Sequence, residues 1–274
     1  MHHSEADIIA QSIHLQSVGN ARELGGYSTA DGKRVKSGLL LRTAALNKIS
    51  REDITRLTEV YHLAVIADLR MTSETADDPD KVIAGVKYVN LRVINEEAHK
   101  ELLAQQEAVK GDTLKTLLVI VDSGFMNDKL YIEFLAEDTG KHAYREFFKE
   151  LLDLSPGKCL LFHCSQGKDR TGCAAMLILS ALGVDEDTIM NDYTLTNAFN
   201  AEVIVSQRKM LLSRGLTEQE LTQYMPVLDE VNPQFMANVI SWLRENYGSP
   251  LGYIIDALGL SEKDIETLRT KFLE

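Results

Sequence analysis

A cysteine and an arginine separated by five residues stand in the segment His163 to Gly172, which reads His-Cys-Ser-Gln-Gly-Lys-Asp-Arg-Thr-Gly. An apolar run precedes Cys164, and a helix-forming stretch, Cys173 to Leu182, follows the segment. Where a strand is followed by a tight loop and the first turn of a helix, several backbone N–H groups converge on one small nest. Such a nest binds a tetrahedral dianion such as phosphate. The pattern predicts a thiolate nucleophile, Cys164, at the base of the nest and a bidentate phosphate clamp, Arg170, at its rim.

The residue types around Cys164 suit this chemistry. A free thiol titrates near ~8.5, so the loop amides, the following helix and the cations Lys168 and Arg170 are needed to favour the thiolate. The Thr171 hydroxyl adds a hydrogen bond to the sulfur, and Gly167 and Gly172 are expected to adopt unusual dihedrals close to the anion. The predicted substrate-binding residues are Ser165, Gln166, Gly167, Lys168 and Thr171.

The segment resembles the signature loop of the cysteine-based protein tyrosine phosphatase superfamily, His-Cys-x5-Arg-Ser/Thr. Its Gly-Lys-Asp-Arg-Thr-Gly version is similar to a bacterial branch with tyrosine phosphatase and often phosphoinositide phosphatase activity. Further segments resemble that branch in the same order along most of the chain: Asn20–Tyr27, Leu39–Ala44, Ala67–Arg70 with Glu74, Asp192-Tyr193 with Thr196-Asn197, and Asn246–Ser249 through Leu258–Leu260. An ordered set of this kind is far more specific than a lone Cys-x5-Arg.

The resemblance leaves the general acid open between two aspartates. Many relatives carry it in a Trp-Pro-Asp loop, but the only tryptophan here is Trp242, near the C-terminus. The branch with Lys-Asp-Arg in its loop implies Asp169 as the acid. Asp68, at the end of an apolar run, is the alternative, although it can equally brace backbone N–H groups or an arginine.

The residues expected to support the site are His163, Asp68 and Arg22. His163 is expected to hydrogen-bond the loop rather than act as a general base, and Lys168 to contact a substrate oxygen. Arg22, with Arg42 and Arg70, adds positive potential near the loop or forms structural ion pairs.

Composition limits the partners. The chain has 274 residues, is 45% hydrophobic and carries a formal charge of −12, which disfavours nonspecific binding to nucleic acid or anionic membranes. The resemblance implies a phosphorylated protein or a phosphoinositide as substrate, with phosphate or sulfate able to occupy the same site. No metal-ligand spacing such as H-E-x-x-H or paired C-x-x-C is present, so no metal or other cofactor is expected.

Three cysteines form no disulfide framework, and the apolar contexts of Cys159 and Cys173 indicate buried thiols. A catalytic thiolate oxidises easily and suits a reducing compartment. Met1 to Ile13 lacks the long apolar core of a signal peptide, and no run is long enough to span a membrane. A cytoplasmic location is expected; export without a cleaved signal stays open.

Alternating strand and helix patterns predict one α/β phosphatase-like domain over residues 1–274, with a central, parallel-rich sheet flanked by helices. Short strands are expected in residues 14–43, a helix capped by Ser50, strands at 62–69 and 86–91, and a helix at 145–154. The C-terminal part is expected to be helical, at 185–199, 200–214, 217–230, 233–247 and 261–272, the last with a capped start at Ser261.

The region from about Glu96 to Lys141 is charged, helix-prone and interrupted by glycines. Its position resembles a helical insertion that covers the active site in related bacterial phosphatases. A surface helical hairpin without a gating role fits the same pattern.

The sequence is compatible with three functions, of which it favours the first. The first is a phosphatase acting through a phosphocysteine on phosphotyrosine, with phosphoserine, phosphothreonine or phosphoinositides as further substrates. The second is a module of the same fold that binds phosphorylated ligands without turnover, which the intact Cys164, Asp169 and Arg170 disfavour. The third, a thiol redox or sulfur-transfer protein, is disfavoured by the arginine and the Thr-Gly pair that follows it.

Overall fold

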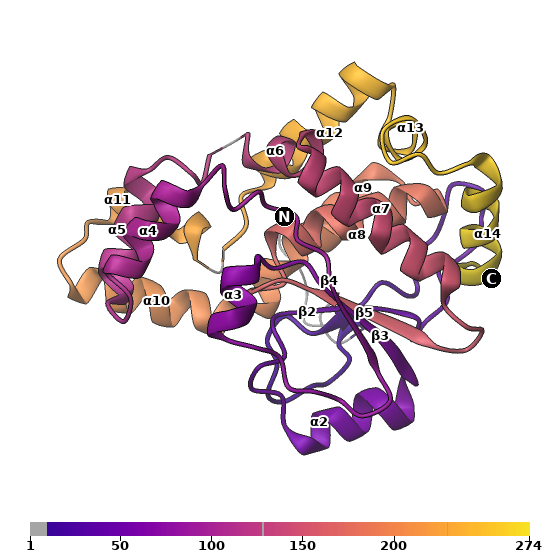
Figure 1. The fold of residues 1–274 in the computed structure, drawn as a ribbon, viewed down its shortest axis with the longest axis horizontal. Helices are drawn as coiled ribbons and strands as arrows, with labels where there is room; N and C mark the ends of the chain where they lie inside the picture. Colours follow the sequence, from indigo (N-terminus) through magenta and orange to yellow (C-terminus); the bar gives the residue numbers. More distant parts are fainter. Residues whose placement is uncertain (1–9, 128, 229) are drawn as a thin grey trace.

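The computed structural model describes residues 10–127, 129–228 and 230–274 (Figure 1). These ranges leave out most of the segment Met1 to Ile13, which was predicted not to be a signal peptide. They also leave out one residue of the helix predicted at 217–230. Five strands form one sheet in the order β1-β2-β5-β3-β4: Arg22–Glu23 (β1), Leu40–Thr43 (β2), Leu63–Asp68 (β3), Lys87–Asn90 (β4) and Cys159–His163 (β5). Only β1 pairs in the antiparallel direction, which confirms the predicted parallel-rich α/β fold.

The central strand β5 shows why both faces of the sheet are covered. Leu160 and Phe162 belong to the larger apolar core, whereas Cys159 and Leu161 belong to a second core on the other side. Successive side chains of a strand point to opposite faces, so an unbroken apolar run requires a layer on each face. In Figure 1 the helix of the second core, α2 (Arg51–Thr55), lies below the sheet, and most of the other helices lie above it.

The helices that surround the sheet follow the expected pattern. The helix at 145–154 is longer than expected, and two helices, at 72–77 and 250–256, were not expected at all. Their bounds are α2 followed by a π-helical turn η1 (Arg56–Val60), α3 (Thr72–Asp77), α6 (Leu130–Ala136), α7 (Asp138–Asp153), α8 (Asp169–Leu182), α9 (Glu186–Phe199), α12 (Pro233–Tyr247), the unexpected α13 (Pro250–Asp256) and α14 (Glu262–Phe272).

Two of the predicted helix starts are confirmed at atomic level. The Ser50 side chain accepts a hydrogen bond from the Asp53 amide at 3.1 Å, and the Ser261 side chain accepts one from the Asp264 amide at 3.2 Å. Such caps satisfy amides that have no partner inside the helix, and they depend only on neighbours in the sequence.

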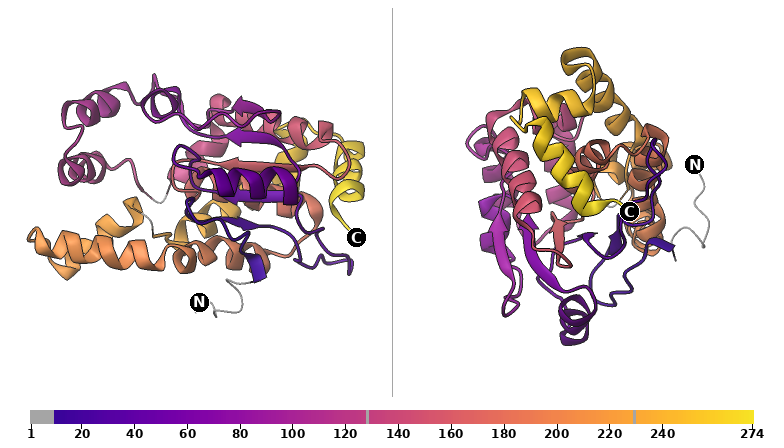
Figure 2. Two further views of the ribbon diagram at one scale, coloured as in Figure 1. Left: turned by 90° about the horizontal axis from the view of Figure 1, so that it is seen from below. Right: turned by 90° about the vertical axis from the view of Figure 1, so that its right-hand side faces the viewer.

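A separate group of helices extends to one side of the sheet (Figures 1 and 2). It consists of α4 (Lys100–Ala108), α5 (Thr113–Asp122), α10 (Ala201–Ser213), α11 (Glu218–Tyr224) and the short 3-10 helix η2 (Met225–Val227). Its own apolar cluster includes Leu117 from α5, Leu211 from α10 and Tyr224 from α11. The expected helical region 96–141 therefore contains α4, α5, α6 and the start of α7, and α5 packs on the 201–227 segment.

The parallel strands end together where the signature segment begins. Thr43 of β2 and Asp68 of β3 both pair with His163, the last residue of β5. Ligand sites of open α/β sheets lie beyond the carboxyl ends of the strands, and this edge holds the loop that starts at Cys164. None of the helices within the described ranges combines the length and apolar character needed to cross a bilayer.

Candidate active site

The loop between β5 and α8 turns sharply at Gly167. This glycine has a φ of +65°, and a Cβ atom there would lie 2.2 Å from the Thr43 carbonyl oxygen. Gly172 differs from the expectation, because it is an ordinary residue of α8 without a positive φ. Its small size matters for packing instead, since a Cβ atom there would lie 3.1 Å from the Tyr193 ring.

The loop carbonyl groups point away from its concave side. The Cys164 oxygen lies 3.1 Å from His163 Nδ1, and the Ser165 oxygen accepts from the Ala45 amide at 3.1 Å. Asn20 Nδ2 donates to the oxygens of Gln166 and Gly167, at 3.2 and 2.9 Å. In a planar trans peptide the N–H points opposite to the C=O. The amides of residues 165–168 therefore face the concave side, where the sequence predicts an anion nest.

Cys164 lies at the base of this nest, with only 2% of its surface exposed. Burial alone would raise the pKa of its thiol, but the Arg170 charge and the Thr171 hydroxyl and amide outweigh burial and lower it. The other thiols behave in the opposite way. Burial raises the pKa of Cys159 to about 12 and that of Cys173 well above its ordinary value. Only Cys164 among the three is thus prepared to be a thiolate.

Arg170 is oriented by a carboxylate from a distant helix. Its Nη1 donates to Glu74 Oε2 at 2.5 Å, and its Nη2 donates to Glu74 Oε1 at 3.0 Å and to Ser165 Oγ at 3.2 Å. Ser165 Oγ also donates to Glu74. These bonds use three of the five N–H groups of a guanidinium, and the others remain for a phosphoryl oxygen.

Asp169, the first residue of α8, is held by a tyrosine. Tyr131 of α6 donates its hydroxyl to Asp169 Oδ1 at 2.5 Å. The other carboxylate oxygen, Oδ2, lies 3.6 Å from Lys168 Nζ. The carboxyl is partly exposed, at 18%, beside the loop that carries Cys164 and Arg170.

We expected Lys168 to point to the anion nest, but it points elsewhere. Its side chain is buried, and its Nζ donates to the carbonyl oxygens of Pro226 at 2.6 Å, Leu228 at 2.6 Å and Glu230 at 3.2 Å. The three donors of the ammonium are therefore taken by the segment that leads into α12. A contact with a substrate oxygen would require release of these carbonyls, and it stays a prediction.

Arg22 and Arg42 lie beneath the loop as structural ion pairs. Both are fully buried and bind Asp192 of α9, with Arg22 Nε 3.2 Å from Oδ1 and Arg42 Nη1 2.5 Å from Oδ2. Arg42 Nη2 also donates to the Gly167 carbonyl at 3.0 Å, and Arg22 donates to the Asn20 side chain that holds the same carbonyl. Their role is to hold the loop from below, and not to present free charge to a ligand.

Comparisons with known proteins agree with this geometry. A model described as "Tyrosine phosphatase family" matches residues 13–274. The chain belongs to the tyrosine phosphatase family. It is 30% identical over 262 residues to a predicted tyrosine-protein phosphatase of Cupriavidus necator, covering 95% of this chain and 88% of the relative. It is 28% identical to a triple specificity protein phosphatase of Mycobacterium tuberculosis, covering 93% and 96%. A tyrosine-protein phosphatase of Nostoc commune is 25% identical, covering 86% and 75%.

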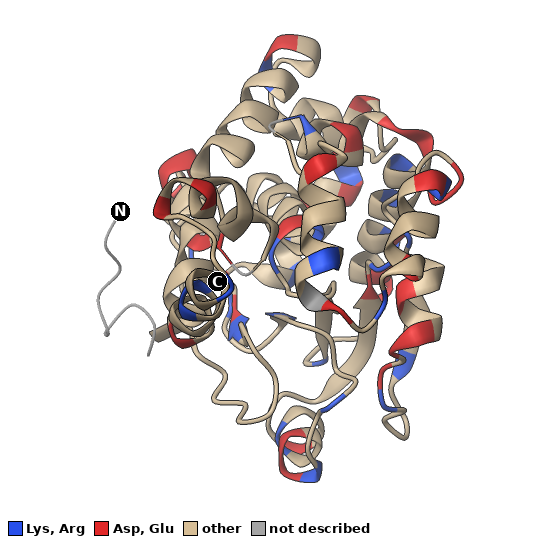
Figure 3. Cartoon of the chain, turned by 90° about the vertical axis from the view of Figure 1, so that its left-hand side faces the viewer, with Lys and Arg blue, Asp and Glu red and all other residues tan. Residues whose placement is uncertain are grey.

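The protein is therefore a phosphatase, an enzyme that hydrolyses phosphoric monoesters and takes a phosphorylated substrate. Lys and Arg residues are interspersed with Asp and Glu on the side of the molecule drawn in Figure 3. The net charge of −12 makes a local source of positive potential necessary, and the sequence predicts that source at Arg170 and the loop amides.

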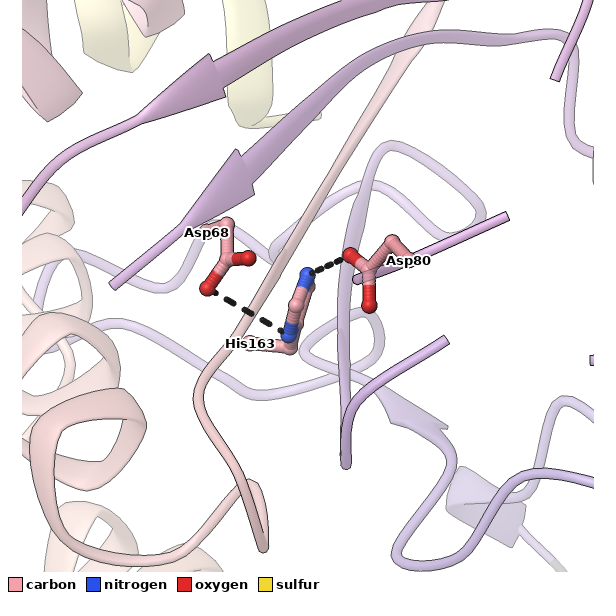
Figure 4. Close-up of side chains that lie close together, drawn as sticks. All are labelled: Asp68, Asp80 and His163. Atoms are coloured by element: carbon pink, nitrogen blue, oxygen red, sulfur yellow. Dashed lines mark ion pairs between the residues drawn. The ribbon is translucent and has the colours of Figure 1, made fainter. Parts of the chain in front are cut away.

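Asp68, the alternative acid, lies in a buried network with His163 and Asp80 (Figure 4). The Asp68 carboxylate accepts from the Arg70 amide at 3.0 Å and from Arg70 Nη2 at 2.7 Å, and Tyr88 donates to it at 2.8 Å. Burial would raise the pKa of Asp68, but His163 and Arg70 lower it overall. An ionised carboxylate with these donors braces Arg70, and it has no proton for a leaving group.

His163 supports the loop from the same network. Its Nε2 lies 2.8 Å from Asp80 Oδ2 and its Nδ1 3.9 Å from Asp68 Oδ1. Burial would lower the pKa of His163, but Asp80 and Asp68 raise it overall. Asp68, Asp80 and His163 lie close enough to hold a metal ion. The Arg70 guanidinium binds both carboxylates, however, with Nη2 2.7 Å from Asp68 Oδ2 and 2.9 Å from Asp80 Oδ1, so a side-chain cation already bridges the two.

Sequence reasoning assigned no role to three residues of this site. Glu74 was noted only as part of a resembling segment, and Asp80 and Tyr131 gave no signal at all. Tyr131 falls in an apolar helix pattern with Leu130, Phe134 and Leu135, all of them buried. Nothing in that pattern distinguishes a hydroxyl that reaches Asp169 from a ring that fills the core.

Proposed function

We propose that this phosphatase acts through a phosphocysteine formed on Cys164. The thiolate attacks phosphorus, an S–P bond forms, and the P–O bond to the leaving group breaks. Asp169 gives its proton to the leaving oxygen, which departs as an alcohol or phenol. Water then attacks phosphorus, the S–P bond breaks with the electron pair returning to sulfur, and Asp169 takes a proton from the water.

The proposal rests on one observation: four consecutive carbonyls turn outward around a thiol whose pKa is lowered. The amides and Arg170 then surround the equatorial oxygens of a phosphoryl group, where the charge of the transition state is spread. In this mechanism they supply the charge neutralisation, so no step is assigned to a cofactor. Inorganic phosphate or sulfate would occupy the same nest.

We propose protein phosphotyrosine as the main substrate, with phosphoserine, phosphothreonine and phosphoinositides as further substrates. The relatives named as tyrosine-protein phosphatases and the triple specificity relative support this breadth. Initial rates of one purified sample on a phosphotyrosine peptide, a matched phosphothreonine peptide and a phosphoinositide would test it. A phosphotyrosine rate no higher than the other two would contradict the preference.

The chemical test uses p-nitrophenyl phosphate in the presence of a chelator. Wild type should release p-nitrophenol with a burst, and Cys164→Ser should abolish turnover but still bind phosphate, because the amide nest survives. Asp169→Asn should lose roughly 100-fold or more on a poor leaving group such as phenyl phosphate and far less on p-nitrophenyl phosphate. Phosphopeptide binding without release of phosphate by wild type would instead favour a binding module.

We also propose that residues 1–274 act as one domain in which region 96–141 covers the active site. Two contacts support this: Tyr131 reaches Asp169, and α5 contacts η2, whose backbone Lys168 holds. Hydrogen exchange of residues 100–122 should slow when vanadate occupies the site, and unchanged exchange would contradict the proposal. We propose a reducing, cytoplasmic setting, because the lowered pKa of Cys164 makes the sulfur sensitive to oxidation.

A further inference from the structure

Two buried tyrosines form a chain of hydroxyl groups that ends on Asp169. Tyr131 of α6 has no exposed surface, and Tyr193 of α9 is 1% exposed. Their hydroxyl oxygens lie 2.7 Å apart, and Tyr131 donates to Asp169 Oδ1 at 2.5 Å. Since the Tyr131 proton goes to Asp169, Tyr193 is the donor in the 2.7 Å hydrogen bond between the two tyrosines. The Asn232 carbonyl oxygen, 3.3 Å from the Tyr193 hydroxyl, is a second and more distant acceptor for the same proton. The direction of the chain is thus Tyr193 to Tyr131 to Asp169.

The chain makes the two oxygens of Asp169 different. Oδ1 accepts from Tyr131, whereas Oδ2 faces Lys168 Nζ at 3.6 Å. The ammonium does not take Oδ2, because its three donors go to the carbonyls of residues 226, 228 and 230. Oδ2 is therefore the oxygen that remains to carry an acid proton.

Ring packing alone does not require these hydroxyl groups. The Tyr131 ring stacks on Phe134 and meets Phe235 and Tyr193 edge to face, as phenylalanine rings would. A buried hydroxyl is costly unless it finds a partner, and here the partner is the proposed acid. Burial and the Asp169 charge raise the pKa of Tyr131 well above its ordinary value, so the phenol stays a donor at every working pH.

We propose that Tyr131, supported by Tyr193, is a positioning residue that holds Asp169 as general acid; this rests on the proposed role of Asp169. The bond to Oδ1 fixes the rotation of the carboxyl and directs Oδ2–H toward the leaving oxygen. As the proton leaves Oδ2, negative charge develops on the carboxylate and the Tyr131 hydrogen bond strengthens. The hydroxyl thus helps most when the leaving group needs the proton.

Tyr131→Phe tests the proposal with two substrates. We expect kcat on phenyl phosphate to fall about 10-fold, which corresponds to ~1.4 kcal/mol, while kcat on p-nitrophenyl phosphate changes less than about 3-fold. Tyr193→Phe should show the same pattern with a smaller effect. An equal loss on both substrates would overturn the proposal.

The matched control is Tyr253→Phe. Tyr253 is also fully buried and donates to a carbonyl, that of Leu135 at 2.8 Å, but it has no contact with Asp169. This variant should lower thermal stability without any dependence on the leaving group. If it reproduces the Tyr131→Phe pattern, the effect is structural and the proposal is wrong.

The double variant Asp169→Asn/Tyr131→Phe separates the inference from the proposed function. Because Tyr131 acts through Asp169, the second change should add less than about 2-fold to the Asp169→Asn loss on phenyl phosphate. Full multiplication of the two losses would show that Tyr131 does not act through Asp169. If Asp169→Asn alone shows no leaving-group dependence, the acid assignment fails and the inference fails with it. If Asp169→Asn shows the leaving-group dependence and Tyr131→Phe does not, only the inference about Tyr131 fails.

Discussion

Glu74 and Arg170 meet edge to edge, with Nη1 2.5 Å from Oε2 and Nη2 3.0 Å from Oε1, although 96 residues separate them in the chain. Glu74 belongs to α3, which follows β3, whereas Arg170 belongs to α8, which follows β5. The two helices start at the same edge of the sheet because β3 and β5 are parallel neighbours. The guanidinium is thereby oriented before any phosphate arrives.

Glu74→Gln should hold the Arg170 guanidinium less firmly. It should also change how the free energy of unfolding depends on pH under acidic conditions. Burial would raise the pKa of Glu74, but Arg170 and Ser165 lower it from 4.5 to about 2. A group whose folded pKa is depressed stabilises the fold above the unfolded value and loses that contribution as pH falls through the folded one. Wild type should therefore lose stability between about pH 4.5 and pH 2 more steeply than Glu74→Gln, in urea unfolding at several pH values.

The same variant should lower kcat/KM about 10-fold at pH 7, because a hydrogen bond between charged groups is lost. Glu150→Gln is the matched control, since Glu150 pairs with the exposed Lys87 away from the loop. The control should change neither property. Equal behaviour of the two variants would contradict the orienting role of Glu74.

Cys164 should be alkylated selectively by iodoacetate. Its pKa is lowered, whereas burial raises the pKa of Cys159 to about 12 and that of Cys173 well above its ordinary value. The thiolate is the reactive form, so modification at pH 7 should reach Cys164 first and inactivate the enzyme. Mass spectrometry of digests would locate the label, and phosphate should protect. Label on Cys159 or Cys173 with activity retained would refute this assignment.

Lys168→Met should destabilise the fold by about 2 to 4 kcal/mol, because three carbonyls lose their common donor. Urea unfolding measures the loss. Lys271→Met is the control, since Lys271 likewise holds carbonyls, those of Leu151 at 3.3 Å and Leu154 at 2.8 Å, at the end of α7. Both variants should lose stability. A raised KM with unchanged stability in Lys168→Met would instead show that Lys168 binds substrate.

Gly167→Ala should abolish activity, whereas Gly172→Ala should reduce it only mildly. At Gly167 a Cβ atom would collide with the Thr43 backbone, and the residue has a positive φ that alanine rarely adopts. The loop must therefore change shape in this variant. At Gly172 the Cβ atom would meet the Tyr193 side chain at 3.1 Å in a regular helix. Phosphate affinity by calorimetry and kcat on p-nitrophenyl phosphate would rank the two. The reverse ranking would contradict the loop geometry described here.

The sequence alone predicted the local parts of this protein. The loop from Cys164 to Arg170 is defined by neighbours within ten residues, and the Ser50 and Ser261 caps depend on residues three positions away. The apolar run before Cys164 likewise predicted a strand, which the structure forms as β5. Local patterns of this kind are set by backbone geometry, so they can be read without knowing the fold.

Only the tertiary structure decided which distant groups serve the loop. Tyr131 reaches Asp169 across 38 residues, Lys168 reaches Pro226 across 58, and Arg22 reaches Asp192 across 170. A buried polar group must find its partner wherever packing places one. The sequence shows that Lys168 is a cation and Tyr131 a ring with a hydroxyl; the packing of α6, α9 and the 226–230 segment determines what each one binds.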